Sequence, residues 1–297
     1  MENKISIIVR SYNDGNIIES VLDRILDQEL PTNYALEILV ADNESSDKTV
    51  EILDNYTKTS LKRINIAKGE YVPGKVLNAC IKETDGNILV FNNSDCIPLS
   101  TNWLKNLVSP LIEKRSVISF ANQRPRENAK ALVKLDHSYA FPSQSNDING
   151  NSEVNPFMFS LASSACTREI WEKGPFREDL QYSEDIEWSW RHAKNGFNVS
   201  YCSDSLVEHS HNYPYAALRK RFFNEGKADR QIFGDIKEKQ YGALRFYSSL
   251  GKKMLRDIFY LVKTFNLLSI PEGLLYRYIQ QSSLRSGYVI QKKNKST

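Results

Sequence analysis

The chain has 297 residues, of which 41% are hydrophobic and 25% charged, and its formal net charge is +3. A chain of this length and composition can bury the core of one large globular domain or of two smaller ones. The net charge is too small to indicate a nucleic-acid-binding surface, so we expect no nucleic-acid partner.

The first hundred residues alternate between strand and helix patterns. Short continuous runs of apolar, mostly β-branched residues are typical of strands buried on both faces of a parallel sheet. The segments between them carry apolar residues at helical spacing, as in "NIIESVLDRILDQEL". The predicted strands cover residues 5–9, 36–42, 63–67 and 87–91, and helices are predicted over 16–30, after Ser46 or Asp47, and over 74–84. This alternation predicts an α/β fold with a mostly parallel central sheet flanked by helices.

The rest of the chain is less regular. Residues 120–165 show no clear periodicity, and the Asn/Ser/Gly cluster at 143–155 predicts a surface loop. A long loop in a compact α/β protein is more often functional than idle. Residues 215–297 have a mainly helical pattern. We therefore expect an α/β domain over residues 1–213 and a mainly helical region over 214–297.

Cysteine spacing and apolar runs bound the location of the protein. The four cysteines are widely spaced and form no CxxC pair, which argues against a disulfide framework or a zinc site. The N-terminal sequence "MENKISIIVRS" has only a short apolar run, and no stretch approaches the roughly 20 apolar residues of a membrane-spanning helix. We expect no signal peptide, reduced thiols and a cytoplasmic location.

Polar side chains gather where three of the predicted strands end. Ser11 and Asn13 follow the first strand, Asp42 ends the second, and Asn93 and Asp95 follow the fourth. The carboxyl ends of parallel strands meet at one edge of the sheet, where open α/β sheets bind ligands. Strand ends are also commonly polar without any ligand, so this pattern alone leaves both interpretations open.

The chain lacks the usual phosphate-binding loops. Neither GxxxxGK[ST] nor GxGxxG occurs, so the P-loop and dinucleotide-binding motifs are excluded. Acidic groups at a sheet edge without such a loop suggest a diphosphate held through a divalent cation. Mn²⁺ or Mg²⁺ can bridge a carboxylate to a diphosphate, because both take oxygen ligands.

Several motifs in a fixed order make the chain resemble a known family. They are "SIIVRSYND", "EILVADNESSDKT", "GKVLNACIKETDGNILVFNNSDCIP", "PFREDLQYSEDIEWSWRHAKNGFNVSY" and "VEHSHNY". In order and spacing, over about residues 4–215, they resemble the inverting family 2 glycosyltransferases of the GT-A fold. The variants "VRSYN", "GKVLN" and "VEHSHNY" look most like bacterial polysaccharide transferases, including rhamnosyltransferases.

The resemblance implies a role for each matching residue. Asp185 would be the catalytic base, with Glu184 as its acidic neighbour. Asp95 would be the metal-contacting acid of the family's DxD motif, whose first position is occupied here by the neutral Asn93, which can only assist through its carbonyl oxygen. His209 or His211 falls where some members supply a further metal ligand. The residues that would line the donor site are Ser11, Asn13, Asp42, Gly74, Asn78, Asn93 and Arg191.

The chemistry of inversion agrees with a single base. One carboxylate must take the proton of the acceptor hydroxyl while its oxygen attacks the anomeric carbon. A retaining double displacement would need a second carboxylate as nucleophile. Glu184 is adjacent to Asp185, but neighbours on a helix point about 100° apart, so we do not expect both to address one centre. The same acids could form a solvated helix face; the nearby Trp188 and Trp190 favour a sugar-binding cleft.

Two further pairs of residues allow two interpretations each. On a strand, His209 and His211 would face the same side, which fits a metal-ligand pair and an ordinary surface pair alike. Arg124 and Arg126 could bind a phosphate or simply solvate a loop.

The C-terminal region is basic and amphipathic. Residues 251–297 contain nine Lys or Arg residues and two acidic ones. Apolar residues between Leu255 and Leu268 are interleaved with basic ones, a pattern that fits a core helix as well as a surface lying on an anionic bilayer. We therefore expect peripheral contact with the inner face of the cell membrane, which would also suit a lipid-linked acceptor.

Together these features predict a glycosyltransferase that moves a sugar from a UDP-, dTDP- or GDP-linked donor to a glycan or polyprenyl-linked acceptor in bacterial surface polysaccharide synthesis. One alternative is a sugar-phosphate nucleotidyltransferase, although "VRSYNDGN" lacks the glycine-rich basic loop that would grip a triphosphate. The other is a non-catalytic degenerate transferase that binds nucleotide or glycan, which only Asn93 favours. The motifs do not distinguish the sugar, the nucleobase or the acceptor.

Overall fold

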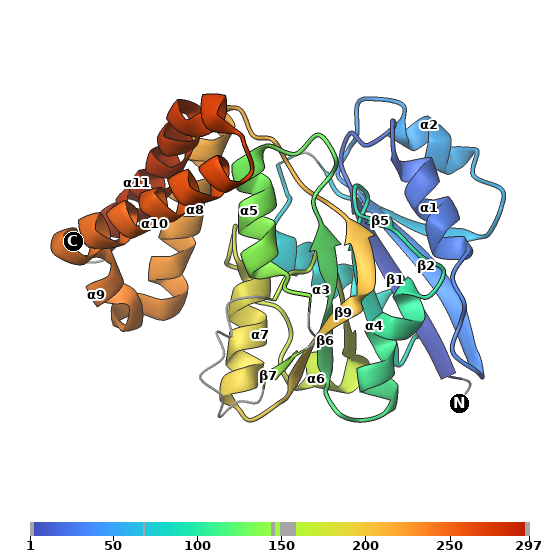
Figure 1. Cartoon of the computed structure of the whole chain (residues 1–297). Helices are drawn as coiled ribbons and strands as arrows, with labels where there is room; N and C mark the ends of the chain where they lie inside the picture. Colours follow the sequence, from blue (N-terminus) through green and yellow to red (C-terminus); the bar gives the residue numbers. More distant parts are fainter. Residues whose placement is uncertain (1–2, 68, 144–145, 149–158, 295–297) are drawn as a thin grey trace. The chain divides into compact units, whose positions relative to one another are not determined.

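The structure, a computed structural model, describes residues 3–67, 69–143, 146–148 and 159–294 (Figure 1). The chain divides into two compact units. The first comprises residues 1–126, 140–179 and 184–209, and the second comprises 127–139, 180–183 and 210–297. Most of the surface loop predicted at 143–155 lies outside the described residues. The domain boundary predicted after residue 213 stays a prediction; the second unit also includes two earlier segments of the chain.

The first unit is built on one mixed sheet, ordered β3-β2-β1-β4-β8-β6-β9-β5 with β7 paired to β9. Its strands are β1 (Asn3–Ser11), β2 (Tyr34–Asp42), β3 (Leu61–Asn65), β4 (Ile88–Asn93), β5 (Ile97–Pro98), β6 (Ile118–Arg124), β7 (Asn146–Ile148), β8 (Ser163–Thr167) and β9 (Val199–Glu208). Strands β1 to β4 pair in parallel, as their apolar runs predict. Strand β8 is antiparallel to both β4 and β6, while β9 is parallel to β6. The predicted α/β fold is confirmed, and β8 makes its sheet mixed.

Helices cover both faces of this sheet. They are α1 (Ile18–Leu26), α2 (Thr49–Asp54), α3 (Pro73–Lys82), α4 (Trp103–Ile112), α6 (Arg168–Lys173) and α7 (Glu184–Lys194). Successive residues of β1 point to opposite faces: Ile7 packs in a core with α1 and α4, and Ile8 in a second core with α3, α6 and α7. Burial on both faces explains why β1 is apolar throughout rather than alternating.

The second unit is helical, as the sequence pattern predicts. It contains most of α5 (Ala131–Ala140), then α8 (Tyr215–Phe233), η2 (Gly234–Lys237), α9 (Glu238–Tyr241), α10 (Ala243–Lys263), η3 (Leu267–Ser269) and α11 (Ile270–Asn294). The buried guanidinium of Arg277 on α11 bridges Asp257 on α10, at 2.6 Å, and Asp136 on α5, at 2.7 Å. Among the residues that the structure describes, no helix combines the length and the apolarity needed to cross a membrane.

Candidate active site

The sheet register brings the predicted polar residues to one edge. The β1–β2 pairing sets Ser11 opposite Asp42, and the β1–β4 pairing sets Arg10 opposite Asn93. Each of these residues lies at or next to the carboxyl end of its strand. The parallel half of the sheet therefore presents a row of polar side chains at the edge where α/β folds bind ligands.

The ends of β1 and β2 are joined by side-chain hydrogen bonds. The buried Asp42 carboxylate accepts from the backbone N–H of Ser45, at 3.0 Å, and from its hydroxyl, at 2.6 Å. Asn13, in the left-handed region with φ 55°, accepts from the backbone N–H of Ser46 at 2.7 Å. The buried Ser11 hydroxyl has no hydrogen-bond partner among the described residues. An unsatisfied buried hydroxyl at a ligand-binding edge is what a bound polar ligand would satisfy.

The stretch "FNNSDCIP" ends β4 and forms a tight turn. The backbone N–H of Cys96 donates to the carbonyl of Asn93 at 3.0 Å, which places Asp95 inside the turn. The Asn93 side chain does not point to a second carboxylate; its oxygen accepts from Arg10 Nη2 at 3.0 Å. Asn93 and Asp95 therefore have different surroundings, although they occupy the two ends of one motif.

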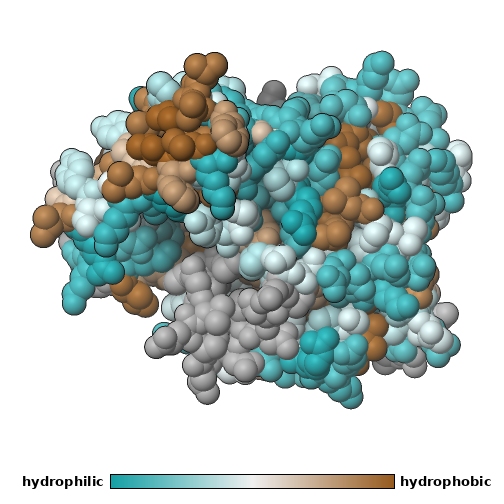
Figure 2. Space-filling view, viewed as in Figure 1, coloured by the Kyte–Doolittle hydropathy of each residue, from teal (hydrophilic) through white to brown (hydrophobic). Residues whose placement is uncertain are grey.

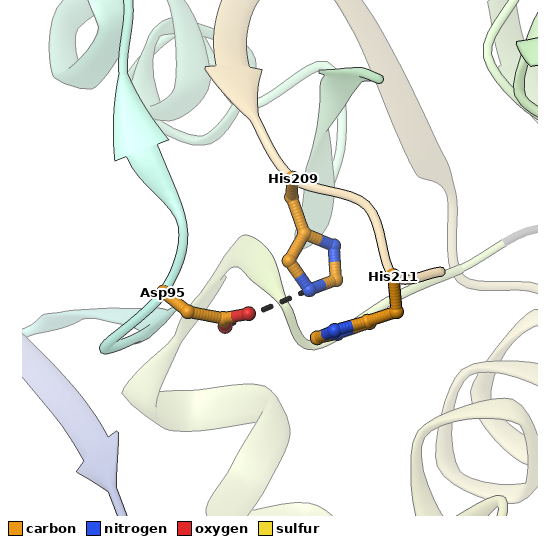
Figure 3. A group of neighbouring side chains, drawn as sticks. All are labelled: Asp95, His209 and His211. Carbon is orange, nitrogen blue, oxygen red and sulfur yellow. Dashed lines mark ion pairs between the residues drawn. The ribbon is translucent and has the colours of Figure 1, made fainter. Parts of the chain in front are cut away.

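Asp95 and His209 form a pair of metal-type ligands within the first unit (Figure 3). Their nearest atoms, Asp95 Oδ1 and His209 Nε2, are 3.6 Å apart. The other oxygen of Asp95 lies 3.6 Å from Arg126 Nη2, which also donates to the Asp95 carbonyl at 2.8 Å. His209 follows the last residue of β9, and its backbone N–H donates to the Arg124 carbonyl at 2.9 Å. Backbone pairing between β6 and β9 thus places the imidazole beside the β4 turn.

The hydrogen bond on the far side of His209 orients its ring. His209 Nδ1 lies 2.8 Å from the amide oxygen of Gln123 on β6, and that oxygen can only accept. In this orientation of the Gln123 amide, Nδ1 carries the proton and Nε2 is left as the ligand nitrogen. Metal-binding histidines commonly donate their other ring N–H to such a partner.

His211 completes a group of three. One ligand atom from each of Asp95, His209 and His211 lies within 4.8 Å of the others. His211 comes only two residues after His209, so the backbone itself keeps it close; its ring stacks on Tyr213. Both histidines follow β9 rather than lying on it, so the strand-face interpretation does not apply. Two ligands of one cation at about 2.1 Å each are separated by roughly 3 to 3.6 Å, and the Asp95–His209 separation fits this range.

A half-buried arginine, Arg10, links the β4 turn to helix α7. Arg10 donates to Asn93 through Nη2, and its Nη1 lies 3.3 Å from the carboxylate of Glu184. Burial first, and then the negative charge of Asp185, raise the pKa of Glu184 to about 7 against the opposing effect of Arg10. The Glu184 carboxylate is thus turned toward Arg10.

Asp185 lies at the first turn of α7 in a different environment. Its Oδ1 accepts from the backbone N–H of Ile186 at 2.8 Å, and its Oδ2 lies 3.5 Å from the N–H of Leu161. It is only half-buried, in contrast to Glu184. A carboxylate at a helix N-terminus is stabilised in its charged form by the helix dipole. Glu184 and Asp185 thus face different partners, as expected for neighbours on a helix.

The other predicted donor-site residues contact the chain itself. Asn78 donates to the Phe176 carbonyl and accepts from Trp171 Nε1, both at 2.9 Å. A Cβ on Gly74 would lie 2.0 Å from the Arg177 carbonyl oxygen, so only glycine permits this approach. Arg191 binds Glu187 on its own helix at 2.9 Å. Gly74 and Asn78 hold the segment that leads toward α7, and their donor contacts stay a prediction.

Two residues of the site were not predicted from the sequence. Arg10 is a polar residue at the end of the first strand, but no sequence signal links it to its partner Glu184, which is 174 residues away. Gln123 lies near the polar end of β6, where no apolar pattern marks a strand. Adjacency to a predicted strand end was the only available signal for Arg10.

Solved structures define the class of the fold. The mannosyltransferase PcManGT from Pyrobaculum calidifontis, determined with GDP-Man and Mn²⁺, superimposes with a TM-score of 0.67 at 19% identity, over 99% of this chain and 88% of that chain. Residues 1–349 of Staphylococcus aureus TarS give a TM-score of 0.57 at 17% identity, over 98% and 92%. The first unit and the helical region that follows it thus have the fold of the GT-A glycosyltransferases.

The family follows from the sequence itself. The family model "Glycosyl transferase family 2" matches residues 6–171, and the chain belongs to this family. The O-antigen chain rhamnosyltransferase RfbN of Salmonella typhimurium is 28% identical over 230 residues, 75% of this chain and 71% of that protein. WbaN of Salmonella anatum, also an O-antigen chain rhamnosyltransferase, is 25% identical over 74% of this chain and 70% of that protein. The predicted glycosyltransferase is confirmed, and these relatives do not favour the nucleotidyltransferase alternative.

Proposed function

We propose that this enzyme transfers a sugar from a nucleoside-diphosphate donor to a glycan or lipid-linked acceptor, with inversion, during assembly of a bacterial surface polysaccharide. The names of its relatives, two O-antigen chain rhamnosyltransferases, support the polysaccharide product. The donors named for solved neighbours, GDP-Man and UDP-GlcNAc, support a nucleotide sugar as the substrate class.

The mechanism rests on one observation: the adjacent acids Glu184 and Asp185 lie in different environments. Arg10 binds the buried Glu184, whereas the half-buried Asp185 has backbone N–H neighbours at the start of α7. Asp185 is thereby the better placed to take the proton of an acceptor hydroxyl, and direct displacement with inversion needs only one such base. Glu184 and Arg10 hold the start of α7 against the ends of β1 and β4.

Asp95 and His209, with His211, are the residues that would hold a divalent cation. A bound cation would neutralise the charge that develops on the departing diphosphate. A mixed imidazole and carboxylate set suits Mn²⁺ better than Mg²⁺, because Mg²⁺ prefers oxygen ligands almost without exception. The Mn²⁺ named with the mannosyltransferase structure supports this choice.

We further propose that Ser11, Asn13 and Asp42 line the nucleoside part of the donor. Asp42 ends β2 next to Ser11, whose buried hydroxyl a ribose or base could satisfy. The acceptor would be glycan or polyprenyl-linked, and the enzyme would work at the inner face of the cell membrane, where such acceptors are anchored.

Changing Asp185 to Asn tests the mechanism. The wild-type chain is incubated with Mn²⁺, lipid-linked glycan acceptors and a panel of UDP-, dTDP- and GDP-linked sugars that includes rhamnose, and products are identified by mass and anomeric configuration. We expect D185N to lower the rate about 10²- to 10⁴-fold, the usual contribution of a general base. Donor binding, measured by calorimetry, should change little, because the carboxylate acts on the acceptor.

The exposed acid Glu172 on α6 provides the matched control, and E172Q should transfer at the wild-type rate. Release of inorganic diphosphate from a sugar phosphate and a nucleoside triphosphate would instead indicate a nucleotidyltransferase. Donor binding without turnover across the panel would indicate a degenerate transferase. Normal turnover by D185N would remove Asp185 from the mechanism.

A further inference from the structure

The second unit contains a helix that carries large apolar residues on its exposed side as well as on its buried side. On α10, Leu255, Phe259 and Val262 recur at intervals of four and three residues and are 69%, 70% and 48% exposed. The inward face of the same helix includes the fully buried Asp257, which is ion-paired with Arg277. In a soluble protein the apolar stripe of a helix normally packs on the core. The buried side of α10 has such a stripe, formed by Phe246, Leu250 and Leu261 beside the ion pair, and the exposed side carries a second set of large apolar residues that no core covers.

The turn after α10 extends this surface. Phe265 and Leu268 are 90% and 99% exposed, and Leu267 between them is 54% exposed. We call the whole surface the apolar face; its residues are Leu255, Phe259, Val262, Phe265, Leu267 and Leu268. Figure 2 shows hydrophobic residues gathered over this part of the second unit, at the upper left of the view. A contiguous exposed surface of this kind usually marks an interaction site.

The charges around the apolar face are of one sign. Residues 243–271 contain five basic residues and a single acid, Asp257. Because Asp257 is buried and paired, the exposed charged side chains of this segment, among the described residues, are basic: Arg245, Lys252 and Lys263. Basic groups beside exposed aromatic and leucine side chains are the composition of helices that lie in a membrane interface.

We propose that the apolar face docks on an anionic lipid bilayer. Phe259, Phe265 and Leu268 would enter the boundary between headgroups and acyl chains, while Lys252 and Lys263 would meet the lipid phosphates. A second copy of the chain is a poorer occupant, because symmetric pairing would bring the same lysines toward each other. Anionic headgroups supply the opposite charge.

The biological role of this docking surface rests on the proposed function, in which the acceptor is lipid-linked. The contacts with lipid themselves do not depend on that function. It would hold the enzyme at the surface where such an acceptor is presented. None of its residues is given a catalytic, metal-binding or donor-binding role, so binding to lipid and sugar transfer can be measured separately.

Vesicle flotation with the 297-residue chain tests the docking surface. The probes are vesicles of phosphatidylcholine alone and vesicles that also contain phosphatidylglycerol. We expect binding to the anionic vesicles, weakened by salt because exposed charges are screened. The variant F259S/F265S/L268S should bind at least about tenfold more weakly, since insertion of apolar side chains supplies much of the affinity. Each of K252Q and K263Q should lose about fivefold, the equivalent of about 1 kcal/mol per lysine.

I236S is the matched control, because Ile236 is 68% exposed in the same unit but outside the apolar face. It should bind vesicles like the wild type. Circular dichroism and donor hydrolysis should be unchanged in the triple variant, since its three positions are on the surface. Absence of wild-type binding, or equal binding by the triple variant, would overturn the proposal. Self-association that the triple variant abolishes, without vesicle binding, would show that a second copy covers the face. If the wild-type chain binds vesicles but transfers no sugar, the result would count against the proposed function and not against the docking surface.

Discussion

At the scale of single residues, Arg10 explains why a neutral Asn93 can stand where the family has an acid. Its guanidinium binds the Asn93 oxygen on one side and the Glu184 carboxylate on the other. A second acid at position 93 would share this arginine with Glu184 rather than lie free for a cation. The metal-type ligands are found instead on the other side of the turn, where Asp95 meets His209.

The two ends of the motif should therefore respond differently to substitution. We expect D95N to weaken Mn²⁺ binding by at least about tenfold, because it removes a charged ligand candidate. N93D should change Mn²⁺ affinity by less than about threefold, because the new carboxylate pairs with Arg10. Calorimetric titration of Mn²⁺ into the protein with nucleoside diphosphate measures both effects, and the exposed acid variant E51Q on α2 is the control. Equal, small effects of D95N and N93D would reduce the stretch to an ordinary turn.

Glu184 makes a separate prediction about pH. Its pKa is raised on folding from its usual value near 4.5 to about 7, chiefly by burial and then by Asp185. The folded chain thus keeps a proton that the unfolded chain has already released. This contribution to stability is fully present below about pH 4.5 and is lost as the pH rises through about 7.

Urea unfolding of the metal-free protein at several pH values checks this sign. The free energy of unfolding of the wild type should fall, relative to that of E184Q, between pH 5 and pH 8, because glutamine stays neutral throughout. The exposed acid variant E169Q should run parallel to the wild type. A constant difference between wild type and E184Q across this range would mean that Glu184 is ionised throughout it in the folded protein.

At the scale of elements, the packing of α8 against α11 depends on two glycines. A Cβ on Gly226 would lie 1.9 Å from the carbonyl oxygen of Leu284, and one on Gly287 would lie 1.9 Å from that of Phe223. The two helices run antiparallel, so these two close contacts lie on either side of the same helix crossing. The backbones approach so closely that any side chain at either position must push the helices apart.

Alanine at Gly226 should therefore destabilise the protein despite its better helix propensity. We expect G226A to lower the free energy of unfolding by about 1–3 kcal/mol, the usual cost of overpacking. Gly251 on α10 is the matched control, because nothing lies within 4 Å of its added Cβ. G251A should raise the free energy of unfolding by about 0.5–1 kcal/mol through helix propensity alone. Urea unfolding followed by circular dichroism compares the two, and a stabilised G226A would contradict the close crossing.

The elements also show where sequence patterns succeed. Strands β1 to β4 were predictable because burial on both faces demands continuous apolar runs. Strand β8 was not, because "SSACT" is small and polar although its serines are fully buried. Helix α5 was hidden in a segment with weak periodicity. Its apolar residues Leu132 and Leu135 pack with Leu261, which is far away in sequence.

At the scale of the whole molecule, the strand pattern locates the edge of the sheet but not its connections. Parallel strands must end on one side, so the apolar runs alone are enough to group Asp42, Asn93 and Asp95. The contact between Arg10 and Glu184 is not predictable in this way, because it depends on how α7 packs and the two residues are 174 positions apart in the sequence. The exposure of Leu255, Phe259 and Val262 on α10 was not predictable either. Helical spacing shows which residues share a side of a helix but not whether that side faces the core or the solvent.

The second unit draws on three separate segments of the chain, and this has a consequence for synthesis. Helix α5 leaves the ribosome more than a hundred residues before Leu261 and Tyr276, against which its apolar side packs. Until Leu261 and Tyr276 emerge, Leu132 and Leu135 cannot make these packing contacts. During translation the early strands can therefore pair before α5 finds its partners, and helices made much later complete the unit to which α5 belongs.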